Sequence, residues 1–371
     1  MTRCLALVVA ACLGAAVVGL PPGALLAQDT PDYLSWADPG PYRSADAADF
    51  SALTSFGADQ RVAATYFFYW FDADTLRAAG EQFPFTPIDA STQSFLSPAW
   101  YEKQFKDMLA AGIDVVLPDY WGEPGQYNRR VAPAPDRNLF ATQGIPPMVD
   151  ALQRLDRAGT PLKIGLFFDT SILNNEDLTT ERGKQIFYAT IRDYFSRIPP
   201  RYWAAIDNRP VVWLYDAQKV SAFDQSTFDY VYDHFAQDFG GLRPWIVREW
   251  QWYTAKNTAT ADVMQTEGLY NWGAAPFGFN PDTRFTVAEV GPGFTSFDEQ
   301  GPNAVDTPRR DGAYYAENLR RAIASGDQIL AIETWNELDE GTGILETREF
   351  GRQYIDLTRR YVDLFKGQPA P

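Results

Sequence analysis

The sequence predicts a single (β/α)₈ barrel of the TIM type, and three observations lead to this prediction. The chain has 371 residues, 46% of them hydrophobic, which is enough for one large domain with a sizeable core. Eight short runs of β-branched and aromatic residues have the composition of strands. Amphipathic segments of helical length lie between most of these runs. Strands that alternate with helices form parallel βαβ units, and eight such units favour a closed barrel.

The expected elements follow one another from residue 62 onward. We expect strands at residues 62–70, 113–118, 162–168, 210–215, 245–249, 269–272, 286–290 and 328–334. Helix start and stop signals, such as Gly112 and the pair Pro199–Pro200, delimit helices at residues 98–111, 146–158, 181–197, 226–239, 311–325 and 347–365. A further short helix is expected at residues 258–267.

A doubly wound open sheet is the alternative to the barrel. No Gly-rich nucleotide-binding loop follows any expected strand, so the barrel is favoured. We expect one catalytic domain at residues 62–367, with long loops at the carboxyl ends of the strands and an N-terminal arm at residues 28–61. The insertion at residues 72–97 is expected to cover part of the barrel mouth.

The first 27 residues have the features of a secretory signal peptide. Arg3 precedes an apolar run at residues 5–20, Pro21 and Pro22 interrupt it, and Ala27 offers a small residue before a cleavage point. A retained membrane anchor is the alternative, but the run is short for a membrane span. We therefore expect a protein secreted to the periplasm or the medium, without a membrane partner after cleavage.

The composition excludes several kinds of chemistry. Cys4 and Cys12 both lie in the expected signal, and His234 is the only histidine, so a cysteine nucleophile, a Ser-His-Asp triad and a histidine-based zinc site are excluded. Carboxylates and tyrosines remain for proton transfer, and no cofactor is implied. The net charge of −16 disfavours nucleic acid and favours a neutral substrate. The 11 Trp and 19 Tyr include candidate platforms for sugar rings.

Carboxylates and aromatic rings follow nearly every expected strand. In a barrel of this type the carboxyl ends of the strands meet at one face, where active sites lie. An acid at one strand end can simply cap the next helix, but a whole ring of acids and aromatic rings suits a polyol. The binding residues expected on this basis are Tyr69, Trp70, Asp119, Tyr120, Trp121, Asp169, Glu249, Trp272, Glu289, Glu333, Trp335 and Asn336.

The end of the eighth strand carries the most specific signal. Glu333, Glu337, Asp339 and Glu340 lie within eight residues, and their mutual repulsion should raise at least one pKa, which is how a carboxyl group stays protonated for general-acid work. A solvated acidic turn or a calcium loop is the alternative. The spacing differs from that of an EF-hand loop, and the apolar residues between the acids disfavour a solvated turn.

This segment resembles a known signature. Residues 332–344, with Glu337, Glu340, Gly341 and Thr342, look like the Asn-Glu-Trp-x-Glu-Gly-Thr-x-Ile motif of the family 99 glycoside hydrolases, the endo-α-mannosidases and mannanases. They also resemble bacterial relatives grouped near that family and near the family 71 α-1,3-glucanases. Residues 66–70, 111–116 and 207–211 fit the same family loosely.

The resemblance implies a retaining glycoside hydrolase that proceeds through a 1,2-anhydro sugar. Carried over to this sequence, Glu337 is the base that deprotonates the 2-hydroxyl of the sugar, and Glu340 is the acid/base. Leu338 replaces the usual Trp and Asp339 replaces a His or Gly. Because of these departures, the sequence does not specify the sugar, its linkage, or whether the enzyme acts in an endo or exo manner. It also does not specify the oligomeric state.

Three other readings compete with this one. The first is a glycosidase that uses Asp216 and Glu289, because many retaining barrels take their acid from strand four and their nucleophile from strand seven; retaining pairs lie about 5 Å apart and inverting pairs roughly 6.5–9.5 Å apart. The second is a non-catalytic carbohydrate-binding barrel. The third is a hydrolase that depends on a metal held by oxygen ligands alone.

Overall fold

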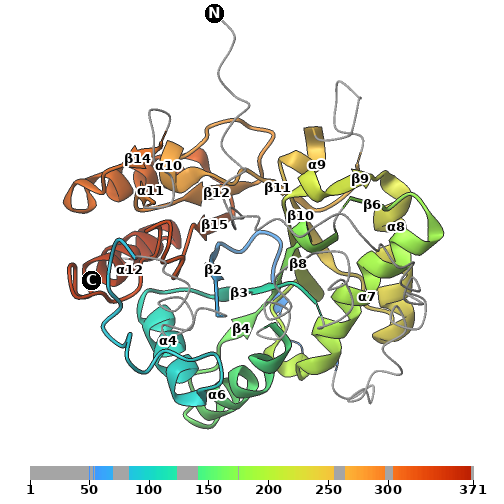
Figure 1. Cartoon of the computed structure of the whole chain (residues 1–371), viewed down its shortest axis with the longest axis horizontal. Coiled ribbons are helices and arrows are strands. Elements are labelled where there is room, and N and C mark those ends of the chain that lie inside the picture. The colour runs from blue at the N-terminus through green and yellow to red at the C-terminus, as the bar shows by residue number, and fades with distance from the viewer. Residues whose placement is uncertain are drawn as a thin grey trace, which may run out of the picture.

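The computed structural model describes residues 50, 53, 55–69, 83–122, 141–173, 175–254, 264–296 and 304–368 (Figure 1). Eight parallel strands of this part form a nearly closed barrel, which confirms the predicted fold class. In order around the barrel they are β2 (Val62–Phe67), β3 (Val115–Tyr120), β5 (Leu166–Asp169) with the short β4 (Lys163–Ile164) before it, β8 (Arg209–Tyr215), β10 (Trp245–Glu249), β11 (Gly268–Tyr270), β12 (Val287–Val290) and β15 (Ile329–Ile332).

The barrel closes where β15 pairs with β2, with Ile329 opposite Val62 and Ile332 opposite Thr65. β11 and β12 are joined over a shorter length of backbone. The N–H of Thr286, just before β12, donates to the carbonyl of Leu269 in β11 over 2.9 Å. Every residue of β2 and β3 is buried, because the interior covers one face of each strand and helices cover the other.

Six helices surround the barrel at the predicted places (Figure 1). Side chains cap several of them: Ser97 accepts from the N–H of Trp100, and Asp224 forms a capping box with Thr227. The six are α4 (Pro98–Ala110), α6 (Ile145–Arg157), α7 (Glu181–Arg197), α8 (Gln225–Asp238), α11 (Ala313–Ser325) and α12 (Gln353–Phe365). Shorter helices, α9 (Gln251–Thr254) and α10 (Ala274–Phe277), follow β10 and β11.

Two helix predictions were wrong in part. The last helix begins at Gln353 instead of residue 347, because residues before it pair with the insertion after β2: the N–H of Arg348 donates to the carbonyl of Thr86 over 2.8 Å. Of the short helix expected at 258–267, residues 264–267 are not helical, and the rest lies outside the described residues.

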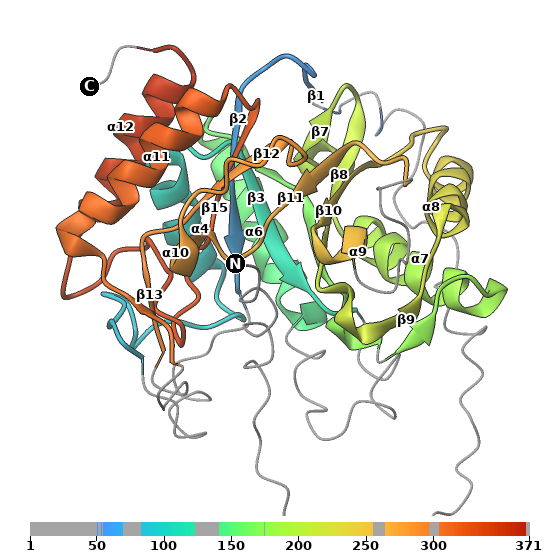
Figure 2. The same ribbon diagram turned by 90° about the horizontal axis from the view of Figure 1, so that it is seen from above.

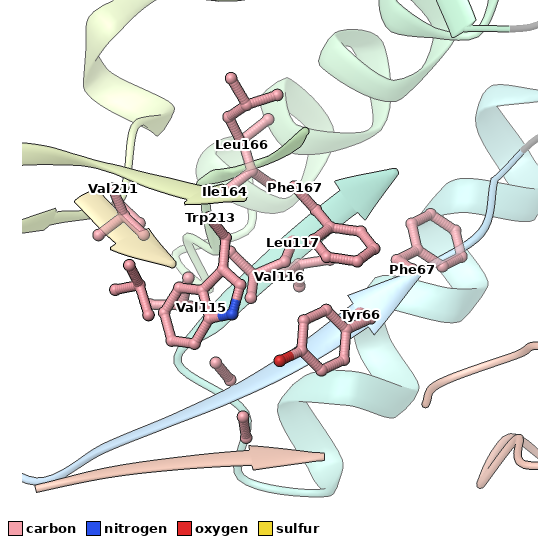
Figure 3. Packing of buried hydrophobic residues seen from close by; sticks show 14 of the residues in the cluster. Tyr66, Phe67, Val115, Val116, Leu117, Ile164, Leu166, Phe167, Val211 and Trp213 are labelled. Atoms are coloured by element: carbon pink, nitrogen blue, oxygen red, sulfur yellow. The ribbon is translucent and has the colours of Figure 1, made fainter. Parts of the chain in front are cut away.

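Aromatic side chains fill the inside of the barrel. The ring of Tyr66 lies 4.7 Å from that of Phe167, and the ring of Trp213 lies 5.5 Å from that of Tyr270. Figure 3 shows Tyr66, Phe167 and Trp213 turned toward one another between the strands. Their large buried surfaces stabilise the closed barrel, and they form a floor beneath the carboxyl ends of the strands.

Segments near the N-terminus lie at the opposite end of the barrel. β1 (Ser55–Phe56) pairs with β7 (Ala205–Ile206), and Figure 2 shows both away from the end where β9 (Val220–Ala222) and β13 (Phe294–Thr295) lie. The expected signal at residues 1–27 lies outside the described residues. In the described part of the chain, every helix is too short or too polar to cross a membrane.

Candidate active site

Buried carboxyl groups gather at the carboxyl ends of the strands. Glu249 ends β10, Glu289 lies in β12 and Glu333 follows β15 directly. These three side chains are at most 3% exposed, and Asp119 and Asp169, at the ends of β3 and β5, are also buried. The structure thus brings the predicted acids of five strands to one face of the barrel.

The loop after β15 is tied to the end of β2. The N–H of Trp335 donates to the carbonyl of Tyr66 over 2.9 Å. Asn336 forms a two-way clamp with Phe68: its Oδ1 accepts from the N–H of Phe68 over 2.9 Å, and its Nδ2 donates to the carbonyl of Phe68 over 3.1 Å. Asn336 therefore positions the residue after it, Glu337, rather than lining the mouth.

Glu337 and Glu340 form an interacting pair in this loop. Glu337 is 7% exposed, its N–H donates to Thr334 Oγ1 over 2.9 Å, and its Oε2 accepts from Thr342 Oγ1 over 3.3 Å. Burial raises its pKa well above the ordinary range, and the charge of Glu340 is the next largest cause. Glu340 is half-buried. The negative charge of Glu340 thus disfavours ionisation of Glu337.

Glu333 is held by backbone amides. Its Oε2 accepts from the N–H of Gly273 over 3.0 Å and of Ala274 over 2.7 Å, at the beginning of α10. These bonds favour the ionised form, but burial outweighs them and raises the pKa of Glu333 to about 7. The group therefore titrates near neutral pH.

Glu249 and Glu289 lie deeper and have fewer partners. Oε2 of Glu249 accepts from the N–H of Gln251 over 2.7 Å, and the hydroxyl of Tyr66 lies beside the carboxyl group of Glu289 and lowers its pKa by hydrogen bonding. Burial raises the pKa of both groups, and for Glu289 the charge of Glu333 is the next largest cause.

Two aromatic rings accompany these acids. Trp272, after β11, is half-buried and stacks on Phe167 at 5.8 Å with an interplanar angle of 17°. The rings of Tyr66 and Tyr215 lie edge-on to the Trp272 ring, with centroid distances of 5.0 and 4.9 Å. Trp121 is mostly buried, and its indole N–H donates to Oδ2 of Asp169. Flat apolar rings beside acceptor oxygens can bind a sugar ring and its hydroxyls.

Three of the expected binding residues do not face the mouth. Tyr69 donates to the carbonyl of Ala141 over 2.6 Å, Tyr120 donates to Asp193 on α7, and Trp335 donates to Gln104 on α4 over 2.8 Å. All three are fully buried between the barrel and its helices. The expectation that they line the mouth is corrected here. Tyr69 and Trp335 lie in the loops after β2 and β15 and turn away from the mouth, and Tyr120 lies in β3, where successive side chains point to opposite faces of the sheet. Trp70 lies outside the described residues.

Neither acid of the alternative pair, Asp216 and Glu289, is among the main charges that raise the other's pKa. Asp216 has a φ of 40° and caps a 3₁₀ turn, its Oδ1 accepting from the N–H of Gln218 over 2.9 Å. Burial raises its pKa to about 6, and Asp169 is the acid that adds most to this rise. The acids that act on Glu289 are Glu333 and Glu249. Asp169 also serves as a cap, because its Oδ1 accepts from the N–H of Ser171 over 3.0 Å.

The sequence prediction missed residues that shape the site. Tyr66, Phe167 and Tyr270 form its floor, and each lies two residues before another inward-facing position, so the two-residue repeat of a strand could have identified them. No local sequence pattern marks Arg309 as part of the site. It is 7% exposed, and its Nη2 donates to the carbonyls of Gly341 and Gly343 over 2.7 and 2.6 Å, which fixes the loop that carries Glu340.

Residues 49–369 match the family described as a domain of unknown function, DUF5010. The chain belongs to this family. Among the described residues of this DUF5010 protein, no three His, Cys, Asp or Glu side chains are arranged to hold a metal ion. A search of curated proteins finds no match to it.

The DUF5010 chain is similar in fold to glycoside hydrolase family 99 endo-α-mannosidase from Bacteroides thetaiotaomicron. One solved structure, in complex with BIS-TRIS-propane, is 18% identical in sequence, and the match covers 83% of this chain and 98% of that chain with a TM-score of 0.59. A second structure of the endo-α-mannosidase is 17% identical, with 84% and 99% covered and a TM-score of 0.58. The predicted likeness to a family 99 barrel is thus confirmed at the level of the fold.

Proposed function

We propose that this chain is a retaining glycoside hydrolase in which Glu337 and Glu340 perform the chemistry. The observation that carries the proposal is the interacting pair of carboxyl groups in the loop after β15, one buried and one half-buried. Two neighbouring carboxyl groups can supply the base and the acid that cleavage of a glycosidic bond requires.

In the first step, the carboxylate of Glu337 takes the proton of the sugar's 2-hydroxyl as that oxygen attacks the anomeric carbon. Glu340 donates its proton to the leaving oxygen, and a 1,2-anhydro sugar results. In the second step, Glu340 takes a proton from water, which opens the anhydro ring at the anomeric carbon, and Glu337 returns its proton to the 2-oxygen. The raised pKa of Glu337 makes its carboxylate a stronger base toward a hydroxyl group.

Three further observations support a carbohydrate substrate. Trp272 offers a half-buried ring, Glu249 and Glu289 offer acceptor oxygens, and the chain shares its fold with an endo-α-mannosidase. The net charge of −16 disfavours acidic polymers. We also propose that the protein is secreted after loss of residues 1–27.

The test is a screen of the mature protein against α-linked polysaccharides and aryl glycosides, with the anomeric form of the first product followed by NMR. We expect cleavage with retention of configuration. Binding without cleavage would leave a sugar-binding barrel, and an inverted product would contradict the anhydro-sugar route.

A further inference from the structure

Glu333 has no role in the proposed proton transfers, yet its carboxyl group joins two distant segments of the chain. It lies directly after β15 and is 1% exposed. Its Oε2 accepts from the N–H of Gly273 over 3.0 Å and from that of Ala274 over 2.7 Å. These donors precede Glu333 by 60 and 59 residues. One oxygen therefore connects the end of β15 to the segment that follows β11.

The bonds to Glu333 replace a cap that the local sequence lacks. The first N–H groups of a helix have no partner within the helix, and a side chain at the N-cap usually accepts from one of them. The N-cap of α10 is Gly273, which has no side chain. Because the acceptor comes from another strand, the bonds that cap α10 also fix its position on the barrel.

Close packing reinforces this attachment. Gly291, directly after β12, lies between the first turn of α10 and the backbone of Glu333. A Cβ at this position would be 2.5 Å from Cα of Ala275 and 2.5 Å from the carbonyl oxygen of Glu333, so a side chain has no room here. The beginning of α10 is thus held against the ends of β12 and β15 together.

Trp272, the aromatic ring of the mouth, is the residue directly before this attachment. Two other bonds of the segment lie further along the chain. The carbonyl of Pro276 accepts from Thr307 over 2.8 Å, and the N–H of Phe279 donates to Asn318 over 3.0 Å. The bonds to Glu333 are therefore closer to Trp272 than either of these, and they fix the backbone from which its ring projects.

We propose that Glu333 is a positioning residue that holds the Trp272 ring at the mouth, where the ring can stack on a sugar. The contact with a sugar rests on the proposed glycosidase function, whereas the attachment of the ring to Glu333 does not. In the competing explanation, the rings of Tyr66, Phe167 and Tyr215 are sufficient to hold Trp272. Glu333 would then stabilise α10 and have no effect on the ring.

Two neutral substitutions separate these explanations. Glu333→Gln keeps an oxygen that can accept from both N–H groups, whereas Glu333→Met has a similar length and only a weakly accepting sulfur. Both variants remove the charge of Glu333, which adds to the burial that raises the pKa of Glu337. A difference between the two variants therefore reports on the hydrogen bonds and not on the charge.

The first measurement is ¹⁹F NMR of protein labelled with 5-fluorotryptophan, without any ligand. Trp272→Phe identifies the resonance of Trp272 among those of the 11 tryptophans. The solvent isotope shift of this resonance between H₂O and D₂O measures how exposed the ring is. We expect a larger shift in Glu333→Met than in Glu333→Gln, and an equal shift in both would overturn the inference. If Glu333→Met does not fold, Glu333→Asp replaces it, because its shorter side chain withdraws the oxygen from the two N–H groups.

The second measurement is KM for two probes, 4-nitrophenyl α-D-mannoside and 4-nitrophenyl α-D-glucoside. We expect KM to be about three- to tenfold higher in Glu333→Met than in Glu333→Gln. With Trp272→Ala added to both, KM should be equal, because the ring through which Glu333 acts is gone. Glu267, just before β11 at the other end of that strand, is the control: its Oε2 accepts from the N–H of Ile246 over 2.7 Å. Glu267→Met and Glu267→Gln should differ in stability and not in KM.

A KM that is equal in Glu333→Met and Glu333→Gln, or a difference that persists when Trp272→Ala is added, would also overturn the inference. The outcome for the proposed function is separate. If the parent cleaves a probe but ring exposure is equal in the two variants, the glycosidase proposal stands and this inference fails. If the parent cleaves neither probe, the NMR comparison still decides whether Glu333 positions the ring, and the full screen decides the proposed function.

Discussion

At the scale of single residues, burial decides the charge of the acids more than their neighbours do. Glu333 accepts two backbone N–H bonds, which favour its ionised form, yet its pKa rises to about 7 because it is removed from water. Glu249, Glu289 and Glu337 are shifted in the same direction for the same first reason. Glu333 is therefore partly protonated near neutral pH.

These shifts predict that stability falls as pH rises through neutrality. The pKa of Glu333 is about 7 in the folded chain and about 4.5 when unfolded, so between these values the folded state binds more protons and rising pH favours unfolding. Glu333→Gln should reduce the loss of unfolding free energy between about pH 5 and pH 7.5 by up to about 3 kcal/mol, measured by urea denaturation. The exposed Glu317→Gln serves as the control, and an unchanged pH dependence in Glu333→Gln would contradict the assignment.

Inward and outward aromatic residues should differ in what their substitution changes. Trp272→Ala removes a half-buried ring of the mouth, so KM for the sugar should rise about tenfold while stability falls little. Tyr120→Phe removes a hydrogen bond to Asp193 outside the barrel and should lower stability by about 1–2 kcal/mol with KM unchanged. Steady-state kinetics measures the effect on KM, and thermal denaturation measures the effect on stability. A raised KM in Tyr120→Phe would show that Tyr120 contacts the substrate after all.

At the scale of elements, the loop after β15 carries Glu337 and Glu340, the two proposed catalytic acids. Gly341 has a φ of 58°, and a Cβ at this position would meet the carbonyl oxygen of Thr295 at 3.0 Å. On its other side Arg309 donates to two carbonyls of the loop and lies against the rings of Phe85 and Tyr354. The loop is thus fixed by contacts from segments far away in the sequence.

Loss of the Arg309 contacts should disable the loop before it unfolds the barrel. Arg309→Met leaves two carbonyls without a donor, so kcat should fall about 10- to 100-fold, with a loss of stability of about 2–4 kcal/mol. The adjacent Arg310→Met is a matched control, because Arg310 is exposed and forms an ion pair with the exposed Glu317, away from the loop. Equal kinetics in the two variants would contradict a positioning role for Arg309.

How far the sequence predicts this molecule depends on the range of the contacts involved. The eight strands were found because their composition and their flanking Gly and Pro residues are local signals. Glu337 and Glu340 were found because they lie in one short segment. Arg309, whose partners lie more than thirty residues away, could not be found in this way. The outward direction of Tyr120 depends on the helix packed against it, which no local pattern contains.

At the scale of the whole molecule, closure of the barrel brings acids from distant strands to one face. Glu249 and Glu333 are 84 residues apart in sequence, yet each lies within electrostatic reach of the other. The barrel strands hold these acids together without disulfide bonds, since both cysteines of the sequence lie within the first 12 residues.

Secretion predicts a protein without thiols. Both cysteines lie in residues 1–27, so the protein collected outside the cells should begin near residue 28 and should not react with a thiol reagent after denaturation. Intact-mass spectrometry and a thiol assay check both points. Two reactive thiols and a mass that includes the N-terminal segment would contradict cleavage.

The central claim is that the acids of the loop after β15, and not Asp216 and Glu289, carry out the chemistry. The most direct test is kcat/KM for Glu337→Gln, Glu340→Gln and Asp216→Asn on the best glycoside found in the screen. Asn suits the left-handed conformation and the cap at residue 216, so this variant should keep the fold. We expect kcat/KM to fall about 10²–10⁴-fold in Glu337→Gln and in Glu340→Gln, and less than about tenfold in Asp216→Asn. Activity that survives in Glu337→Gln and Glu340→Gln but is lost in Asp216→Asn would contradict it.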